Sequence, residues 1–196
     1  GGVSSGFSPL EMAGAYATFG NGGIYNEPIT IEKIVQSDGT VIEAEQESHR
    51  AMSEETAYLL TDMLHSAISE GTGTAANVGG MYLSGKTGTT NIPSDIISKY
   101  GMASGAIRDS WFVGYSQYYT AAVWTGFINN EDGYITNSTQ SKPWAVFRNL
   151  MKYLNPYDSS APTRPSSINA ITIELESGDE DGEVQTPSKF TPSQYQ

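Results

Sequence analysis

Apolar residues recur at helical spacing in three segments of the chain, and the first has the clearest start signal. Ser8 is a predicted N-cap, Pro9 suits the first helical position, and Glu11 completes a capping box. Gly20 ends this helix. Its apolar positions are predicted to form a buried stripe: Met12, Ala13, Tyr16 and Ala17.

Two further helices are predicted by the same spacing. One runs from about Ser53 to Glu70, and Gly71 ends it. The other begins near Pro143 and continues to Leu154. Their predicted buried faces are Leu60, Leu64, Ala67 and Ile68 in the earlier helix, and Trp144, Phe147, Leu150, Met151 and Leu154 in the later one.

The segments between the helices predict strands. Residues 82–90 form one candidate, and residues 110–115 and 119–126 form an antiparallel hairpin in which Trp111 and Trp124 are predicted to pack in the core. A second hairpin is predicted around residues 37–42. Helices before and after an antiparallel sheet favour an α+β fold.

Charge and composition limit the classes of function. The 196 residues include 10 Lys+Arg, 22 Asp+Glu and no cysteine, which gives a net charge of −12. This acidity argues against a nucleic-acid surface, and the absence of cysteine excludes disulfides and thiolate zinc sites. We expect no metal site, since His49 and His65 have no neighbouring acidic cluster. No apolar run is long enough to cross a bilayer.

The composition changes after residue 154. Residues 155–196 carry 7 acidic and 2 basic side chains and are rich in Pro, Ser and Thr. Such a segment buries too little apolar surface to offset its chain entropy, so we expect a mostly flexible acidic tail with one short strand at residues 171–175. Residues 1–154 form the predicted folded part.

Lys86-Thr87-Gly88-Thr89-Thr90 is the stretch whose residue types call for a chemical explanation. Glycine weakens a strand and often marks the close approach of a ligand. Lys86 supplies a positive charge, and the hydroxyls of Thr87 and Thr89 supply short directional donors, so the segment suits a carboxylate. The backbone of such a strand can also pair with an extended peptide. An exposed strand lysine between turn residues is the competing interpretation. Another glycine-rich run, residues 71–74, is too short for a phosphate loop.

Four separated blocks resemble the transpeptidase domain of class A penicillin-binding proteins, in the family's order. They are residues 7–25, 71–75, 84–90 and 109–115. The resemblance covers about residues 1–154 and implies the fold of penicillin-recognising serine acyltransferases, a five-stranded antiparallel sheet between helices, of which this chain holds the C-terminal part. It also implies a peptidoglycan D,D-transpeptidase that cross-links stem peptides and is acylated by β-lactams, with no cofactor for this reaction.

The resemblance assigns roles to the Lys-Thr-Gly segment. Lys86 attracts the C-terminal carboxylate of a D-Ala-D-Ala stem peptide, and the Thr87 and Thr89 hydroxyls, with Thr90 beside them, hold that carboxylate or its β-lactam counterpart. The backbone N–H of Thr89 forms half of the oxyanion hole. Gly88 has no side chain, so the substrate can lie against the strand.

Two motifs of the family are missing. No serine has a lysine three positions later, and Ser167-Ile168-Asn169 matches Ser-x-Asn only by letters, since it follows the Lys-Thr-Gly segment. We therefore expect the nucleophile and the second motif on an N-terminal portion of the same domain. The chain is then either the docked C-terminal piece of a nicked domain, which we favour because the sheet would otherwise expose apolar faces, or a truncated product.

The same fold also serves other functions. A β-lactam sensor domain, a D,D-carboxypeptidase and a β-lactamase are alternatives, and the blocks at residues 7–25 and 109–115 favour the cell-wall synthase. The expected location is the bacterial cell envelope, outside the cytoplasmic membrane. Contact with the membrane is expected only through an N-terminal anchor that this chain lacks.

Overall fold

A computed structural model describes residues 6–154 and 159–173 of the chain. Residues Gly1–Thr163 form one compact unit and residues Arg164–Gln196 form a second. All helices and strands of the described residues lie in the first unit. Residues 171–173 are not in a strand, so this part of the predicted strand at 171–175 is wrong, and residues 174 and 175 lie outside the described residues.

The first helix, α1 (Pro9–Gly20), begins with the predicted capping box. The Ser8 hydroxyl accepts a hydrogen bond from the Glu11 N–H at 3.2 Å, and the Glu11 carboxylate accepts one from the Ser8 N–H at 2.7 Å. The predicted buried stripe is only half-buried, whereas Gly14 and Thr18 are the buried residues. Small residues therefore make the closest helix contacts, and the larger side chains border a groove described below.

The other helices follow the predicted order. They are α2 (Glu54–Ser69), the 3₁₀ helix η1 (Thr74–Ala76), α3 (Ser94–Tyr100) and α4 (Lys142–Leu154). The predicted bounds of α2 and α4 are confirmed within one or two residues, and Ser53 caps α2 through the Thr56 N–H. The short helices η1 and α3 were not predicted.

The strands form three separate sheets. Strand β1 (Ile24–Asn26) pairs with β4 (Ser48–Arg50), and β2 (Lys33–Val35) pairs with β3 (Val41–Glu43). The largest sheet has the order β5-β6-β7, all antiparallel, with β5 (Ser84–Asn91), β6 (Ile107–Tyr115) and β7 (Thr120–Gly126). Both predicted hairpins are confirmed. The resemblance implies five strands in the main sheet, and the described residues supply three.

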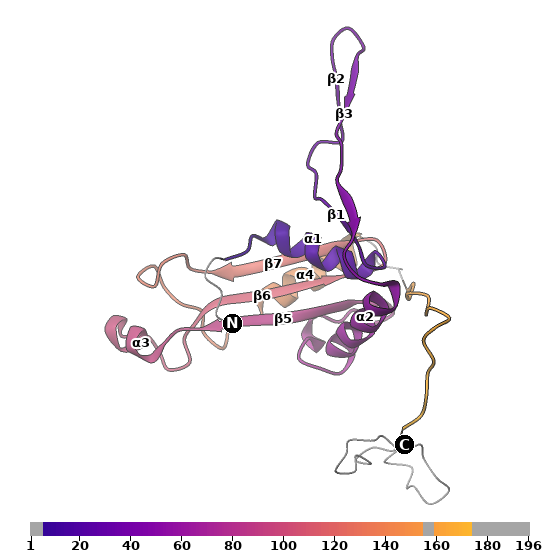
Figure 1. The fold of residues 1–196 in the computed structure, drawn as a ribbon. Helices are drawn as coiled ribbons and strands as arrows, with labels where there is room; N and C mark the ends of the chain where they lie inside the picture. Colours follow the sequence, from indigo (N-terminus) through magenta and orange to yellow (C-terminus); the bar gives the residue numbers. More distant parts are fainter. Residues whose placement is uncertain (1–5, 155–158, 174–196) are drawn as a thin grey trace, which may run out of the picture. The chain divides into compact units, whose positions relative to one another are not determined.

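The strand register separates the two faces of the main sheet. Phe112 pairs with Thr87 and Val123, whereas its neighbour Trp111 pairs with Gly88 and Trp124. Successive side chains of a strand point to opposite faces. Helix α4 covers the Phe112 face, where the Phe112 and Phe147 rings lie 4.6 Å apart between centroids, and α1 packs on β6 and β7 (Figure 1).

The main core lies between α4, α2 and the Phe112 face of the sheet. Its buried residues are Ile68, Ala76, Val78, Met81, Leu83, Phe112, Phe147 and Met151. Of the predicted faces, Ile68, Phe147 and Met151 are fully buried, whereas Leu150 and Leu154 are 36% exposed. Leu150 and Leu154 therefore lie at the rim of this core, whereas Met151 between them lies inside it.

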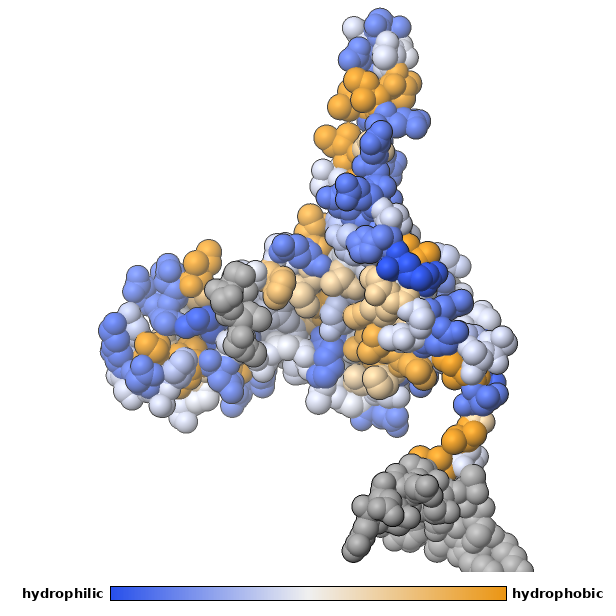
Figure 2. All heavy atoms as spheres, viewed as in Figure 1, coloured by the Kyte–Doolittle hydropathy of each residue, from blue (hydrophilic) through white to orange (hydrophobic). Residues whose placement is uncertain are grey.

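The β2–β3 hairpin extends away from the main sheet (Figure 1). Its aliphatic side chains are exposed, as the orange spheres of Figure 2 show: Ile34, Val35, Val41 and Ile42, each 48–60% accessible. A two-stranded hairpin gains little stability from such contacts alone. It is joined to the β1–β4 pair, where the Tyr25 and His49 rings pack in a tilted arrangement with centroids 5.3 Å apart.

A buried hydroxyl pair connects α2 to the end of β6. The Thr61 and Tyr115 hydroxyls lie 2.9 Å apart, and Thr61 also donates to the Ala57 carbonyl in the preceding turn. Burial raises the pKa of Tyr115 to about 12, although the hydrogen bonds of its hydroxyl with Thr61 and Ser84 oppose the shift. Burial likewise raises the pKa of Tyr82 to about 12.

Phe147 is expected to be a large contributor to stability. Phe147→Ala removes a fully buried ring from the contact with Phe112, and we expect the free energy of unfolding of the domain to fall by about 3–5 kcal/mol. Urea titration followed by circular dichroism measures this change. Tyr153→Ala, a truncation of an 85% exposed ring on the same helix, should change stability little. Equal losses in the two variants would contradict the assigned core.

The Tyr115 hydroxyl predicts an alkaline loss of stability. Since its pKa is raised from 10.0 to about 12 in the folded state, its contribution is complete below pH 10 and is lost as the pH rises towards 12. Tyr115→Phe should cost about 1 kcal/mol at neutral pH and make the decline above pH 10 shallower. Urea titrations across this range test both effects, with the exposed Tyr118→Phe as control. An unchanged alkaline slope in Tyr115→Phe would contradict the prediction.

Candidate active site

The Lys-Thr-Gly segment lies on an edge strand. Within the described residues β5 pairs only with β6, so the second edge of β5 has no strand beside it. In an antiparallel pair, alternate residues direct their N–H and C=O groups away from the partner. Lys86 to Thr90 therefore present backbone donors and acceptors along an open edge, which is the arrangement that an added extended peptide requires.

Lys86 and Thr87 form one hydrogen-bonded cluster at this edge. The Lys86 ammonium donates to the Thr87 hydroxyl at 3.1 Å and to the Thr72 hydroxyl at 3.0 Å, and it lies 3.4 Å from the Thr87 carbonyl oxygen. The Thr87 hydroxyl donates to Thr72 at 3.3 Å. The Lys86 side chain is exposed, and its hydrogen-bond partners among the described residues are neutral oxygens, so its positive charge is not neutralised within this part of the chain.

A groove of about 540 Å³ runs along the same segment. All five predicted site residues line it: Lys86, Thr87, Gly88, Thr89 and Thr90. Lys86 and Thr89 are exposed, and the other three are half-buried. The sequence thus identified one wall of a real cavity. The opposite wall is apolar and comes from α1 and the residues just before it: Met12 and Tyr16 of the helix and the preceding Phe7 line the groove.

The prediction that Trp111 and Trp124 pack in the core is wrong. Both are half-buried and line the groove, with their rings 6.4 Å apart between centroids. They lie on the face of the sheet opposite Phe112. Aromatic residues favour strands on either face, so the sequence alone did not indicate that these two rings are partly exposed. The indole N–H of Trp124 donates to the Asp109 carboxylate at 2.9 Å, and this bond fixes the ring beside the cluster.

Gly88 lies opposite Trp111 in the strand register, at the centre of the groove wall. A Cβ atom at this position would contact only the Trp111 Cβ, at 3.4 Å, so the fold itself tolerates a side chain here. At Gly85, by contrast, a Cβ would lie 2.7 Å from the Val113 carbonyl oxygen. Strand packing therefore requires glycine at position 85 but does not require it at position 88, which lines the groove.

Thr72 is the site residue that the sequence analysis missed. It belongs to the Gly71–Thr74 segment, which we rejected as a phosphate loop and included in one of the blocks that resemble the family, without a role for Thr72. Its hydroxyl accepts from both Lys86 and Thr87. Two glycines beside a threonine were a usable signal, because glycine marks close backbone approach. The segment lies 14 residues before Lys86, so only the folded chain brings the two together.

His65 is held by contacts within the fold. His65 Nδ1 lies 2.8 Å from the Leu83 carbonyl oxygen, and its ring stacks on Tyr82 with centroids 3.8 Å apart. Within residues 6–154 and 159–173, no group of three or more His, Cys, Asp or Glu side chains could hold a metal ion. None of the helices in this described part has both the length and the apolar character needed to span a bilayer.

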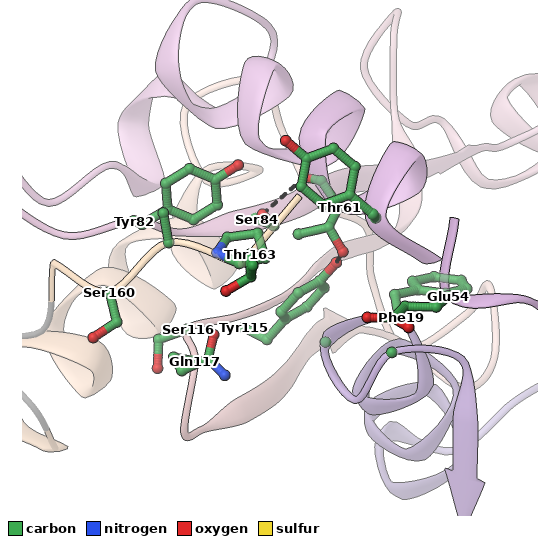
Figure 3. Close-up of a pocket in the computed structure, with 15 residues that line it drawn as sticks. Phe19, Glu54, Thr61, Tyr82, Ser84, Tyr115, Ser116, Gln117, Ser160 and Thr163 are labelled. Carbon is green, nitrogen blue, oxygen red and sulfur yellow. Dashed lines mark hydrogen bonds between the residues drawn. The ribbon is translucent and has the colours of Figure 1, made fainter. Parts of the chain in front are cut away.

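A second, smaller cavity of about 230 Å³ lies at the other end of β6 (Figure 3). Tyrosines 58, 82 and 115 line it together with Ser84, and none of residues 86–90 takes part. The Ser84 hydroxyl donates to the Thr61 carbonyl at 2.9 Å and is fully buried. The Ser84 and Tyr115 hydroxyls are thus engaged in the fold, and the groove beside Lys86 is the better candidate site.

The family model described as "Penicillin binding protein transpeptidase domain" matches residues 2–152. The chain is 45% identical over 175 residues to penicillin-binding protein 1A/1B of Bacillus subtilis, and 42% identical over 159 residues to penicillin-binding protein 1A of Streptococcus oralis. These alignments cover 88% and 78% of this chain. The chain spans only 19% and 24% of the respective relatives.

A solved structure shares the fold. PonA1 of Mycobacterium tuberculosis in complex with penicillin V superposes with a TM-score of 0.64, at 22% sequence identity, over 90% of this chain and 43% of that one. The predicted α+β transpeptidase-like fold is thereby confirmed. The chain belongs to the penicillin-binding protein transpeptidase domain family.

Proposed function

We propose that this chain supplies the Lys-Thr-Gly wall of a peptidoglycan D,D-transpeptidase. The reaction is acyl transfer: a serine attacks the penultimate D-Ala carbonyl of a stem peptide, the terminal D-Ala leaves, and the amine of a second stem peptide then takes the acyl group from the serine. The observation that carries the proposal is the exposed Lys86–Thr87–Thr72 cluster on the open edge of β5, facing a groove.

Each residue of the segment has a role in this proposal. The Lys86 ammonium attracts the terminal carboxylate of the donor peptide. The Thr89 hydroxyl donates to this carboxylate, and the Thr87 hydroxyl does so after its proton turns from the 3.3 Å bond with Thr72 towards the ligand. The backbone N–H of Thr89 donates to the oxyanion that forms on the attacked carbonyl. Such a preorganised donor stabilises the transition state because it needs no reorientation when the charge develops. Gly88 leaves room for the peptide, and Thr90 extends the same wall.

The serine nucleophile and the Ser-x-Asn motif come from a polypeptide portion outside this sequence. No serine of the chain has a lysine three residues later, and the relatives are about four to five times longer than the aligned segment. Ser167-Ile168-Asn169 belongs to the second unit and follows the Lys-Thr-Gly segment in the sequence, whereas the family places its Ser-x-Asn motif before that segment. We further propose β-lactams as covalent ligands and the outer side of the bacterial cytoplasmic membrane as the location, with any membrane anchor outside this chain.

Lys86→Ala tests the proposal in the full-length protein. We expect the rate of acylation by a fluorescent penicillin to fall by about 100-fold or more, because the carboxylate loses its charged partner. Thermal unfolding should be nearly unchanged, since Lys86 is exposed and makes no core contact. Lys152→Ala removes an exposed lysine from α4 and should acylate normally.

The position of the label and the products complete the test. Mass spectrometry should locate the penicilloyl group on a serine outside this chain, and label on any residue of this chain would contradict the assignment of the nucleophile. A stem-peptide donor and an amine acceptor should give the cross-linked product. Release of hydrolysed donor alone would indicate a carboxypeptidase instead, and normal acylation of Lys86→Ala would remove Lys86 from the site.

A further inference from the structure

The Gly71–Thr74 segment places one hydroxyl group against the reactive end of Lys86. The Thr72 hydroxyl oxygen accepts from the Lys86 ammonium at 3.0 Å and from the Thr87 hydroxyl at 3.3 Å. Thr72 does not line the groove, whereas Lys86 and Thr87 do. Its hydroxyl therefore supports the cluster from a position outside the groove and is not itself placed against a ligand.

The backbone around Thr72 is fixed by close packing on the end of α2. A Cβ atom at Gly71 would lie 2.9 Å from the Ala67 Cα, and one at Gly73 would lie 3.0 Å from the Ala67 carbonyl oxygen. The Gly73 N–H donates to that same carbonyl at 2.8 Å. A side chain at Gly71 would force the chain or the helix to shift, and one at Gly73 would make an unusually tight contact, so glycine suits both sides of Thr72. The Gly-Thr-Gly sequence thus holds the threonine at a defined distance from the helix.

The following residues attach this segment to the core. The Gly73 carbonyl accepts from the Ala76 N–H at 2.8 Å, and Ala76 is fully buried in the main hydrophobic cluster. On the other side, Arg148 of α4 donates to the Ala75 carbonyl at 3.2 Å. The Thr72 hydroxyl is therefore presented by a rigid support, although the residue itself is exposed.

The Lys86 ammonium needs such a support. A lysine side chain has four rotatable carbon bonds and loses much rotamer entropy when it is held in one place. Thr72 and Thr87 accept two of its three N–H bonds at 3.0 and 3.1 Å. The third makes only a 3.4 Å contact with the Thr87 carbonyl oxygen, a bond weak enough for a carboxylate to replace.

We infer that Thr72 is a positioning residue, which holds the Lys86 ammonium and the Thr87 hydroxyl in the geometry that receives the substrate carboxylate. This inference rests on the proposed function. It gives the glycine-flanked threonine at 71–73 a role in the acyl-transfer reaction, exerted through Lys86 and without contact to the substrate. It also predicts that the acylation rate depends on the hydroxyl group of Thr72 and not on its methyl group.

Three variants of the full-length protein test the inference. Thr72→Val keeps the shape of the side chain and removes the hydroxyl, and we expect the second-order rate constant for acylation by a fluorescent penicillin to fall about five- to tenfold. Thr72→Ser keeps the hydroxyl and should stay within about twofold of the wild type. Thr74→Val, an exposed threonine two residues later, is the matched control and should acylate normally.

A double-mutant cycle separates positioning from a structural effect. In a Lys86→Ala background, with labelling followed over hours, Thr72→Val should cause no further loss, because residues that act through one another are not additive. A structural role would lower the rate equally in both backgrounds, would lower the thermal unfolding temperature, and would overturn the inference. So would wild-type acylation by Thr72→Val. Failure of the wild type itself to be labelled would instead refute the proposed function.

Discussion

The pairing of β5 with β6 along a single edge is the constraint on which the site depends. Backbone groups of β5 that face β6 form the hydrogen bonds of the sheet. Those that face away have no partner strand among the described residues, and an extended peptide could pair with them. The side chains follow from this position. An exposed lysine and three small hydroxyl residues are acceptable on an edge strand, whereas the same residues in a central strand would bury an unpaired charge.

The two faces of the sheet differ in their packing: one is covered by the core and the other borders the groove. The Phe112 face packs against Phe147 and the rest of the α4 contact, and it holds the fully buried residues. The opposite face carries Trp111 and Trp124 beside Lys86, and α1 borders it without filling it. Because of this separation, a charged, hydroxyl-rich segment can lie in the same sheet as the fully buried core residues.

The support of Lys86 comes from glycine packing and the end of a helix. Gly71 and Gly73 allow the chain to return within contact distance of Ala67, and this return brings Thr72 to the ammonium. Hydrogen bonds of an exposed lysine are weak when both partners move freely. They become useful for recognition when the acceptor is held by the fold, as Thr72 is, because less entropy is then lost on binding.

The sequence by itself determined the longer helices, the hairpins and the residues that form one wall of the groove. Capping residues fixed the starts of α1 and α2, β-branched and aromatic residues fixed the β6–β7 hairpin, and the blocks around Lys86 fixed the family. These signals are local, since a cap or a turn involves residues a few positions apart. Only the tertiary structure decided that Trp111 and Trp124 border a groove and that Thr72 reaches Lys86. Both depend on which face of a sheet a helix covers and on contacts between segments distant in sequence, and neither is encoded in the periodicity of a single segment.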